Sequence, residues 1–149
     1  MEYIKVIFFL AALIFPLILL FDAKLAEYFK GFIRLFLIVH FTILVILIFK
    51  LHHLLRDNFN IPNTVTYLVS AIPFVLFFKK YIGQLRSKES IYLVISLVLL
   101  GIAVIIDLLS DGKIFDIPNN YLIEETFRIV GALVWFIYNY LIFVRIKKF

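Results

Sequence analysis

The segment YLIEETFRIV, residues 121–130, holds the residues best suited to acid–base or ion chemistry. Glu124, Glu125 and Arg128 stand at the start of a long apolar run. On a helix, Arg128 lies about one turn beyond both glutamates, so either carboxylate can pair with the guanidinium. The pattern predicts a charge-paired helix entrance, whose carboxylates could instead serve as acid and base or as cation ligands.

The histidines are the other candidates for chemistry. The chain has three, His40, His52 and His53, and His53 is followed four residues later by Asp57. This spacing places an imidazole and a carboxylate on one helical face. His52, His53 and Asp57 could contribute to a divalent-metal site. The H-E-x-x-H spacing of metallohydrolases is missing, so we predict no metal, no cofactor and no catalytic residue, and read this stretch as an amphipathic helix end.

Three short patterns resemble the motifs of intramembrane glutamate proteases. They are E-E-x-x-R at 124–128, F-x-x-x-H at 36–40 and H-x-x-x-D at 53–57. Those families place the glutamate motif before the histidine motifs, whereas here it comes last. The chain is therefore not assigned to them. The resemblance implies an intramembrane hydrolase in which Glu124 or Glu125 acts with His53, which is our second alternative function.

Composition decides the class of protein. The chain has 149 residues, of which 64% are hydrophobic and 18% aromatic, with a mean hydropathy of +1.08. Soluble domains are usually near half apolar, and one small core cannot bury this excess. We therefore predict an integral membrane protein of a bacterial-type inner or plasma membrane. Cysteine is absent, which excludes thiolate chemistry and disulfides.

The spans follow from the apolar runs. Residues 4–21, 32–49, 64–78, 91–109 and 125–144 approach the ~20 residues that a membrane helix needs. They show no period-two alternation, so we predict an all-α, polytopic transmembrane bundle that forms one domain, 1–149, with no soluble domain. Residues 64–78 are the shortest run and contain Pro73. A half-span there would leave four full crossings.

The basic residues predict the orientation. The net charge is +5, but Lys and Arg cluster at the ends of apolar runs, which indicates contact with lipid and not with nucleic acid. Five crossings place about twice as many of them on the side of the first and third loops and the C-terminus, namely Lys24, Lys30, Arg34, Lys79, Lys80, Arg86, Lys88, Arg145, Lys147 and Lys148. The positive-inside rule then predicts an outside N-terminus and a cytoplasmic C-terminus.

Polar residues inside the spans predict an interior cluster. Such residues face the bundle interior because lipid cannot satisfy them. The predicted members are His40, Asp107, Glu124, Glu125, Arg128 and Asn139. Acidic residues also gather between the last two spans, including Asp111 and Asp116. We interpret these polar stripes as packing seams between helices, with a water-filled path as the alternative.

Three functions remain open at this point. The first is a non-enzymatic accessory, immunity or defence-type, or sensor module that acts through a membrane-protein partner or as a homo-oligomer. The second is a small channel or a proton- or cation-coupled carrier that uses the interior polar residues. The third is the intramembrane hydrolase. The small size and the lack of a catalytic motif favour the first.

Overall fold

The computed structural model describes residues 2–111 and 118–148. In chain order the elements are α1 (Glu2–Leu20), α2 (Glu27–Ile43), the π-helical turn η1 (Leu44–Ile48), α3 (Leu51–Phe59), α4 (Asn63–Tyr81), the 3₁₀ turn η2 (Gln84–Arg86), α5 (Ser90–Asp111) and α6 (Asn120–Lys147). The described residues contain no strand, so the prediction of an all-α chain is confirmed.

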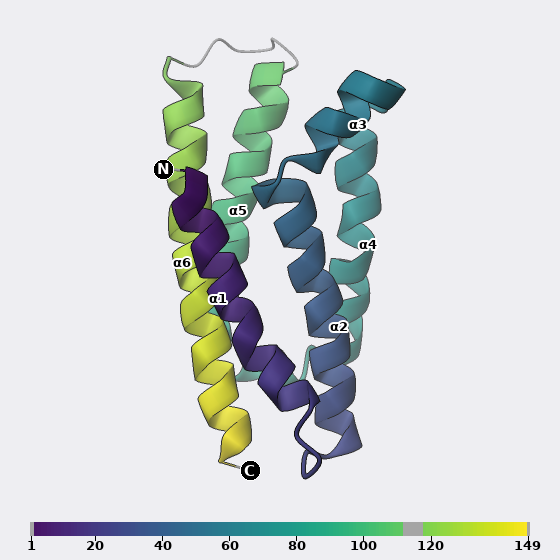
Figure 1. Cartoon of the computed structure of the whole chain (residues 1–149), viewed down its shortest axis with the longest axis vertical. Coiled ribbons are helices and arrows are strands. Elements are labelled where there is room, and N and C mark those ends of the chain that lie inside the picture. Colours follow the sequence, from purple (N-terminus) through teal and green to yellow (C-terminus); the bar gives the residue numbers. More distant parts are fainter. Residues whose placement is uncertain (1, 112–117, 149) are drawn as a thin grey trace.

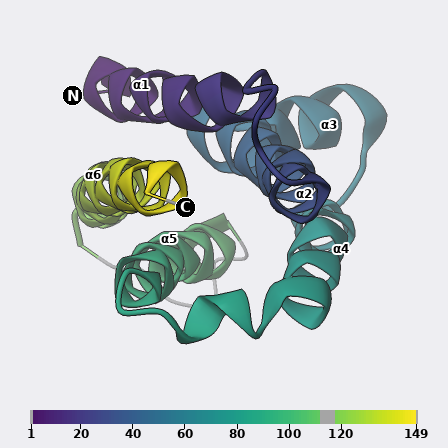
Figure 2. The same cartoon turned by 90° about the horizontal axis from the view of Figure 1, so that it is seen from below.

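The long helices form an up-and-down bundle. In Figure 1, α1, α2, α4, α5 and α6 run alternately up and down the long axis, and the short α3 lies across one end. Helix α6 packs between α1 and α5, while α2 packs against α1 and α4. Figure 2 shows that the helices form an open ring. Their packing order is α5, α6, α1, α2 and α4, so α5 and α4 are the first and last helices of this order. We call the end with α3 and the start of α6 the α3 end, and the opposite end, with η2 and the α1–α2 turn, the η2 end.

Four helices are long and apolar enough to cross a bilayer. They contain Tyr3–Leu20, Glu27–Ile48, Ser90–Ser110 and Asn120–Lys147. Helix α4 has 19 residues and lies beside α2, but it is less apolar and carries Lys79 and Lys80 in its last turn. The fifth predicted run is therefore helical, while its sequence is the weakest of the five as a membrane span.

The chain reverses at the end of α2 through an unusual backbone. Residues Leu44–Ile48 form a π-helical turn, and Lys50 then adopts a left-handed conformation with φ 53°. This conformation costs a non-glycine residue roughly 1–2 kcal/mol, so the surrounding contacts must hold it. The reversal directs α3 across the bundle and turns His52 inward, where its side chain is fully buried.

A polar tether ties three helices together at mid-bundle. The indole Nε1 of Trp135 donates to Nδ1 of His40 (2.9 Å), so the other ring nitrogen, Nε2, carries the proton that His40 donates to the Phe9 carbonyl (3.0 Å). The Trp135 ring also stacks on Phe9 and Phe36. His40 is thus a neutral, fully bonded core residue that joins α1, α2 and α6.

Helices α5 and α6 approach closely along a polar seam. The hydroxyl of Ser96 donates to the carbonyl of Gly131 at 2.7 Å. A Cβ atom at Gly131 would lie only 3.0 Å from Cγ and Cδ2 of Leu100. Small residues at this position let the two backbones meet, which is the packing-seam role expected of polar and small residues in helical bundles.

Exposed ion pairs close the η2 end. Lys147 at the end of α6 donates to Asp22 at 2.6 Å, and Arg145 lies 3.3 Å from Glu89. The hydrogen bond from Lys147 lowers the pKa of the Asp22 carboxyl. The pair therefore stays ionised at pH values at which an ordinary aspartate would be protonated. These pairs join the end of α6 to both neighbouring connections.

We expect Gly131→Val to destabilise the bundle. The added side chain must displace Leu100 at the tightest point between α5 and α6, and such overpacking costs about 1–3 kcal/mol. The thermal unfolding of purified protein in detergent measures this cost. Gly101→Ala is the matched control, because a Cβ there meets nothing within 4 Å. Equal transition temperatures for the two variants would contradict the close approach.

Candidate functional site

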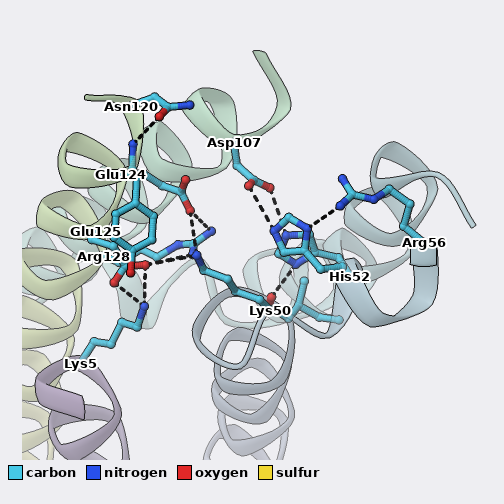
Figure 3. Close-up of polar contacts among 12 residues, drawn as sticks. Lys5, Lys50, His52, Arg56, Asp107, Asn120, Glu124, Glu125 and Arg128 are labelled. Atoms are coloured by element: carbon cyan, nitrogen blue, oxygen red, sulfur yellow. Dashed lines mark hydrogen bonds and ion pairs between the residues drawn. The ribbon is translucent and has the colours of Figure 1, made fainter. Parts of the chain in front are cut away.

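Two groups of polar side chains lie at the α3 end (Figure 3). The charge cluster consists of Lys5, Lys50, Glu124, Glu125 and Arg128. The His–Asp cluster consists of His52, His53, Tyr67 and Asp107. Figure 3 shows Lys50 between Glu125 and His52, so the turn after η1 borders both groups.

The charge cluster is built around a buried ion pair. Nζ of Lys5 donates to both carboxylate oxygens of Glu125, at 2.7 Å to Oε1, and the two side chains are 2% and 1% exposed. Lys50 reaches the same Oε1 at 3.4 Å. Because Lys5 lies in α1 and Glu125 in α6, the pair fixes the relative height of these helices.

Arg128 completes the charge cluster from inside α6. Its Nη2 lies 2.6 Å from Oε1 of Glu124, and its Nη1 lies 3.5 Å from Oε1 of Glu125. The sequence predicted both pairings from spacing alone. The contact with Glu124 is close but poorly aligned, since Nη2, Nε and Glu124 Oε1 make no hydrogen bond to any described residue. We therefore regard it as a charge contact, not a hydrogen bond.

The charge balance of this cluster favours a structural role. Three cations surround two carboxylates, and Lys50 also lies 3.7 Å from Glu124. A glutamate that acts as a general base must reach a proton on its substrate. Here each carboxylate is buried and lies within 4 Å of at least two cations, so its oxygens are occupied and little accessible to a substrate.

The His–Asp cluster brings together residues from three segments. Asp107 of α5 receives a hydrogen bond from the Tyr67 hydroxyl of α4 (2.7 Å to Oδ2), and Nε2 of His52 lies 3.0 Å from the same oxygen. Nε2 of His53 lies 3.5 Å from Oδ1. Both carboxylate oxygens therefore face imidazole nitrogens, and the Asp107 side chain is 5% exposed.

Hydrogen bonds assign the proton on each imidazole. Nδ1 of His52 lies 2.8 Å from the Ile46 carbonyl, which can only accept, so Nδ1 of His52 carries a proton. Arg56 donates to Nδ1 of His53 at 3.0 Å, so the proton of His53 is on Nε2 and points at Asp107. Nε2 of a neutral His52 would then present a lone pair to a carboxylate.

An apolar cavity adjoins this cluster. It has a volume of about 440 Å³ and lies between α2 with η1, α4 and α5, where Ile46, Phe74, Leu97 and Val104 are among its lining residues. The Tyr67 ring lines the cavity, while its hydroxyl reaches Asp107. The cavity thus ends at the polar groups of the α3 end.

The hydroxyls of the cavity wall are already used. Thr42 donates to the Ile38 carbonyl at 2.8 Å, and Ser70 donates to the Thr66 carbonyl at 2.6 Å. Both bonds stay within their own helices. The wall consequently offers an occupant apolar contact along its length, with polar contact concentrated at Tyr67.

The structure distributes the six residues of the predicted interior cluster over separate places. Glu124, Glu125 and Arg128 lie together, and Asp107 belongs to the neighbouring His–Asp cluster. His40 lies in the mid-bundle tether, and Asn139 is buried further along α6, where its amide donates to the Trp135 carbonyl at 2.8 Å.

The acidic candidate Asp57 lies apart from the buried groups. Asp57, the predicted neighbour of His53, is exposed and pairs with Arg56 at 3.0 Å. The carboxylate beside the imidazoles is that of Asp107, not that of Asp57. Asp116 and the side chain of Asp111 lie outside the described residues.

Three residues of the site were not predicted by the sequence analysis. Lys5 carried a usable signal, because a lysine inside an apolar run needs a carboxylate at its own depth. Lys50 carried no specific signal, because a lysine at the end of an apolar run is common in membrane proteins. Tyr67 carried no signal, since one tyrosine in an apolar helix is unremarkable without its tertiary partner.

We expect the Lys5–Glu125 pair to show strong energetic coupling. Removing one partner of a buried pair costs about 3–5 kcal/mol, because the other charge stays buried. Lys5→Met and Glu125→Gln should each lower the thermal stability strongly, and the double variant should lose much less than the sum. The exposed pair Lys30–Glu27, at 3.3 Å, is the control, for which we expect little change. Additive losses at Lys5 and Glu125 would contradict the pairing.

Comparison with known proteins identifies a family. No curated protein and no solved structure matches the chain. The family described as "Domain of unknown function (DUF8692)" matches residues 6–142, a range that includes every residue of the His–Asp cluster and of the charge cluster except Lys5. The match covers nearly the whole chain, and the protein therefore belongs to the DUF8692 family.

Proposed function

We propose that the protein crosses the membrane five times, with its N-terminus outside and its C-terminus in the cytoplasm. Helix α4 supports this topology, because its 19 residues run antiparallel to α2 along the bundle (Figure 1). At ~1.5 Å per residue such a helix covers nearly the ~30 Å of a hydrocarbon core. The basic residues of the η2 end supply the positive-inside bias.

Single cysteines test this topology on a chain that has none of its own. We expect an impermeant maleimide to label Asn58→Cys on intact cells, and Lys88→Cys only after permeabilisation, because α4 separates these two exposed positions. Labelling of both positions from the same side would show that α4 does not cross. Labelling of Lys88→Cys alone on intact cells would reverse the orientation.

Within that topology, we propose that the protein is a non-enzymatic sensor or accessory module that binds an amphipathic, lipid-like molecule. The cavity of about 440 Å³ beside the His–Asp cluster carries this proposal. Its volume is within the usual range of ligand pockets, ~300–1,000 Å³, and its apolar wall with polar groups at one end is typical of them. An alkyl chain suits the wall, because an apolar cavity is unfavourable for water.

The distribution of charge supports a binding module over a channel. Charged side chains of the described residues lie toward the two ends, and the middle of the bundle is filled by Phe9, Phe36, His40 and Trp135. Trp135 donates its hydrogen bond to His40, and His40 donates to the Phe9 carbonyl, so these polar atoms are already hydrogen-bonded. An ion would find few free polar groups there to replace its water.

Photolabelling tests the cavity. The probe is palmitic acid that carries a diazirine, added to the purified protein in lipid nanodiscs, with labelled residues mapped by mass spectrometry. We expect labelling at the cavity residues Ile46 and Val104, and a several-fold loss there in Gly101→Phe, whose added ring enters open space beside the cavity. Labelling of the outward-facing Ile72 should not change.

Gly83→Phe is the matched control for the photolabelling, because Gly83 also has open space but lies at the η2 end, outside the cavity. We expect its labelling pattern to equal that of the unchanged chain. Cavity labelling no stronger than that of Ile72, or unchanged by Gly101→Phe, would overturn the proposed binding function.

A further inference from the structure

The His–Asp cluster has fewer protons than its hydrogen-bond acceptors need. Nδ1 of His52 donates to the Ile46 carbonyl, so Nε2 of the neutral ring has no proton, yet it lies 3.0 Å from the carboxylate of Asp107. The Tyr67 hydroxyl is close to both, at 2.9 Å from Nε2 and 2.7 Å from Oδ2, but it has one proton to donate. Two facing acceptors require a positive species between or beside them, either a second proton on His52 or a metal ion.

The second imidazole, that of His53, favours the metal. One ligand atom each from His52, His53 and Asp107 all lie within 4.8 Å of one another. Zinc binds imidazole nitrogen and carboxylate oxygen at ~2.0–2.2 Å in tetrahedral geometry, so its ligand atoms stand somewhat over 3 Å apart. Separations of 3.0 Å and 3.5 Å from Asp107 to the two histidines are close to that geometry. A second proton on His52 would leave His53 at 3.5 Å from Asp107, whereas a metal ion would be bound by both imidazoles.

The surroundings hold these ligands as a metal site requires. A metal-binding histidine usually donates the N–H of its other ring nitrogen to a carbonyl or carboxylate, which fixes the ring and its tautomer. His52 does this with the Ile46 carbonyl, which belongs to the π-helical turn η1. Tyr67 holds Asp107 in the same way through Oδ2. His52 is fully buried, so its orientation is set by the fold.

We propose that His52, His53 and Asp107 form a binding site for Zn²⁺ or a similar divalent transition metal, with three protein ligands and one open position. This site goes beyond the proposed binding function and does not depend on what fills the cavity. The chain has no cysteine, so its ligands are nitrogen and oxygen atoms only.

Arg56 opposes metal binding in this site. Its guanidinium donates to Nδ1 of His53, which keeps the proton on Nε2, the nitrogen that faces Asp107. Metal binding must move that proton to Nδ1 and displace Arg56 from the ring. Arg56 is partly exposed and also contacts Asp57 at 3.0 Å, so it has another partner at the surface.

Metal titration tests the site directly. Purified protein without a polyhistidine tag is titrated with Co²⁺, whose visible absorption reports tetrahedral nitrogen and oxygen ligands, and then with Zn²⁺ in competition. We expect one metal per chain. Asp107→Asn and His53→Gln should weaken binding at least tenfold, while Asp57→Asn, the exposed carboxylate one turn beyond His53, should leave it unchanged.

Arg56→Gln separates the metal site from a merely structural cluster. Because it removes the opposing guanidinium at a partly exposed position, this variant should bind the metal several-fold more tightly. It also keeps the proposal testable if Asp107→Asn does not fold. No bound metal in the unchanged chain and in Arg56→Gln would overturn the proposal and leave a second proton on His52 as the positive species. Equal binding in His53→Gln would also overturn it, because the metal would then not use this ligand set. The palmitate labelling of the cavity would be unaffected by that result.

Discussion

The buried ion pair of Lys5 and Glu125 is the contact on which the α3 end depends. A lysine and a glutamate that are 2% and 1% exposed are stable only if their heights match, since either charge alone would be strongly unfavourable inside the bundle. The pair therefore sets the register of α1 against α6. Helix α6 in turn meets α5 at Gly131, and α5 carries Asp107. The position of the His–Asp cluster thus follows from a contact in which none of its members takes part.

The same cost of buried polarity explains why the two ends differ. At the η2 end the ion pairs Lys147–Asp22 and Arg145–Glu89 are partly exposed, so water satisfies what the partners do not. At the α3 end five charged groups are buried and must find their partners within the protein, namely Lys5, Asp107, Glu124, Glu125 and Arg128. Between the ends, the Thr42 hydroxyl and the Asn139 amide nitrogen donate to backbone carbonyls of their own helices. Among the residues that the structure describes, the α3 end combines buried charge with a neighbouring cavity, and specific chemistry is therefore expected there.

The helices and the local pairs were predictable from the sequence, whereas the site was not. Long apolar runs without period-two alternation specify helices, because a helix satisfies all backbone groups within one segment in an apolar setting. The pairing of Arg128 with Glu124 and Glu125 was predictable because helical spacing alone brings them together. The same local reasoning paired His53 with Asp57, but the reversal at Lys50 turns the imidazoles toward α5 and Asp107. Contacts such as Lys5–Glu125 span 120 residues, and only the packing order of the helices determines them.

Tyr67 makes the cavity and the His–Asp cluster interdependent. Its ring forms part of the apolar wall, and its hydroxyl is shared between Asp107 and His52. An occupant that shifts the ring must lengthen or redirect that hydroxyl bond, and a cation on Asp107 must strengthen or replace it. If both ligands bind, each therefore changes the affinity of the other by the same factor, because coupling free energy between two sites is reciprocal. A sensor needs such a coupling, and Tyr67, which lines the cavity and donates to Asp107, links the two sites.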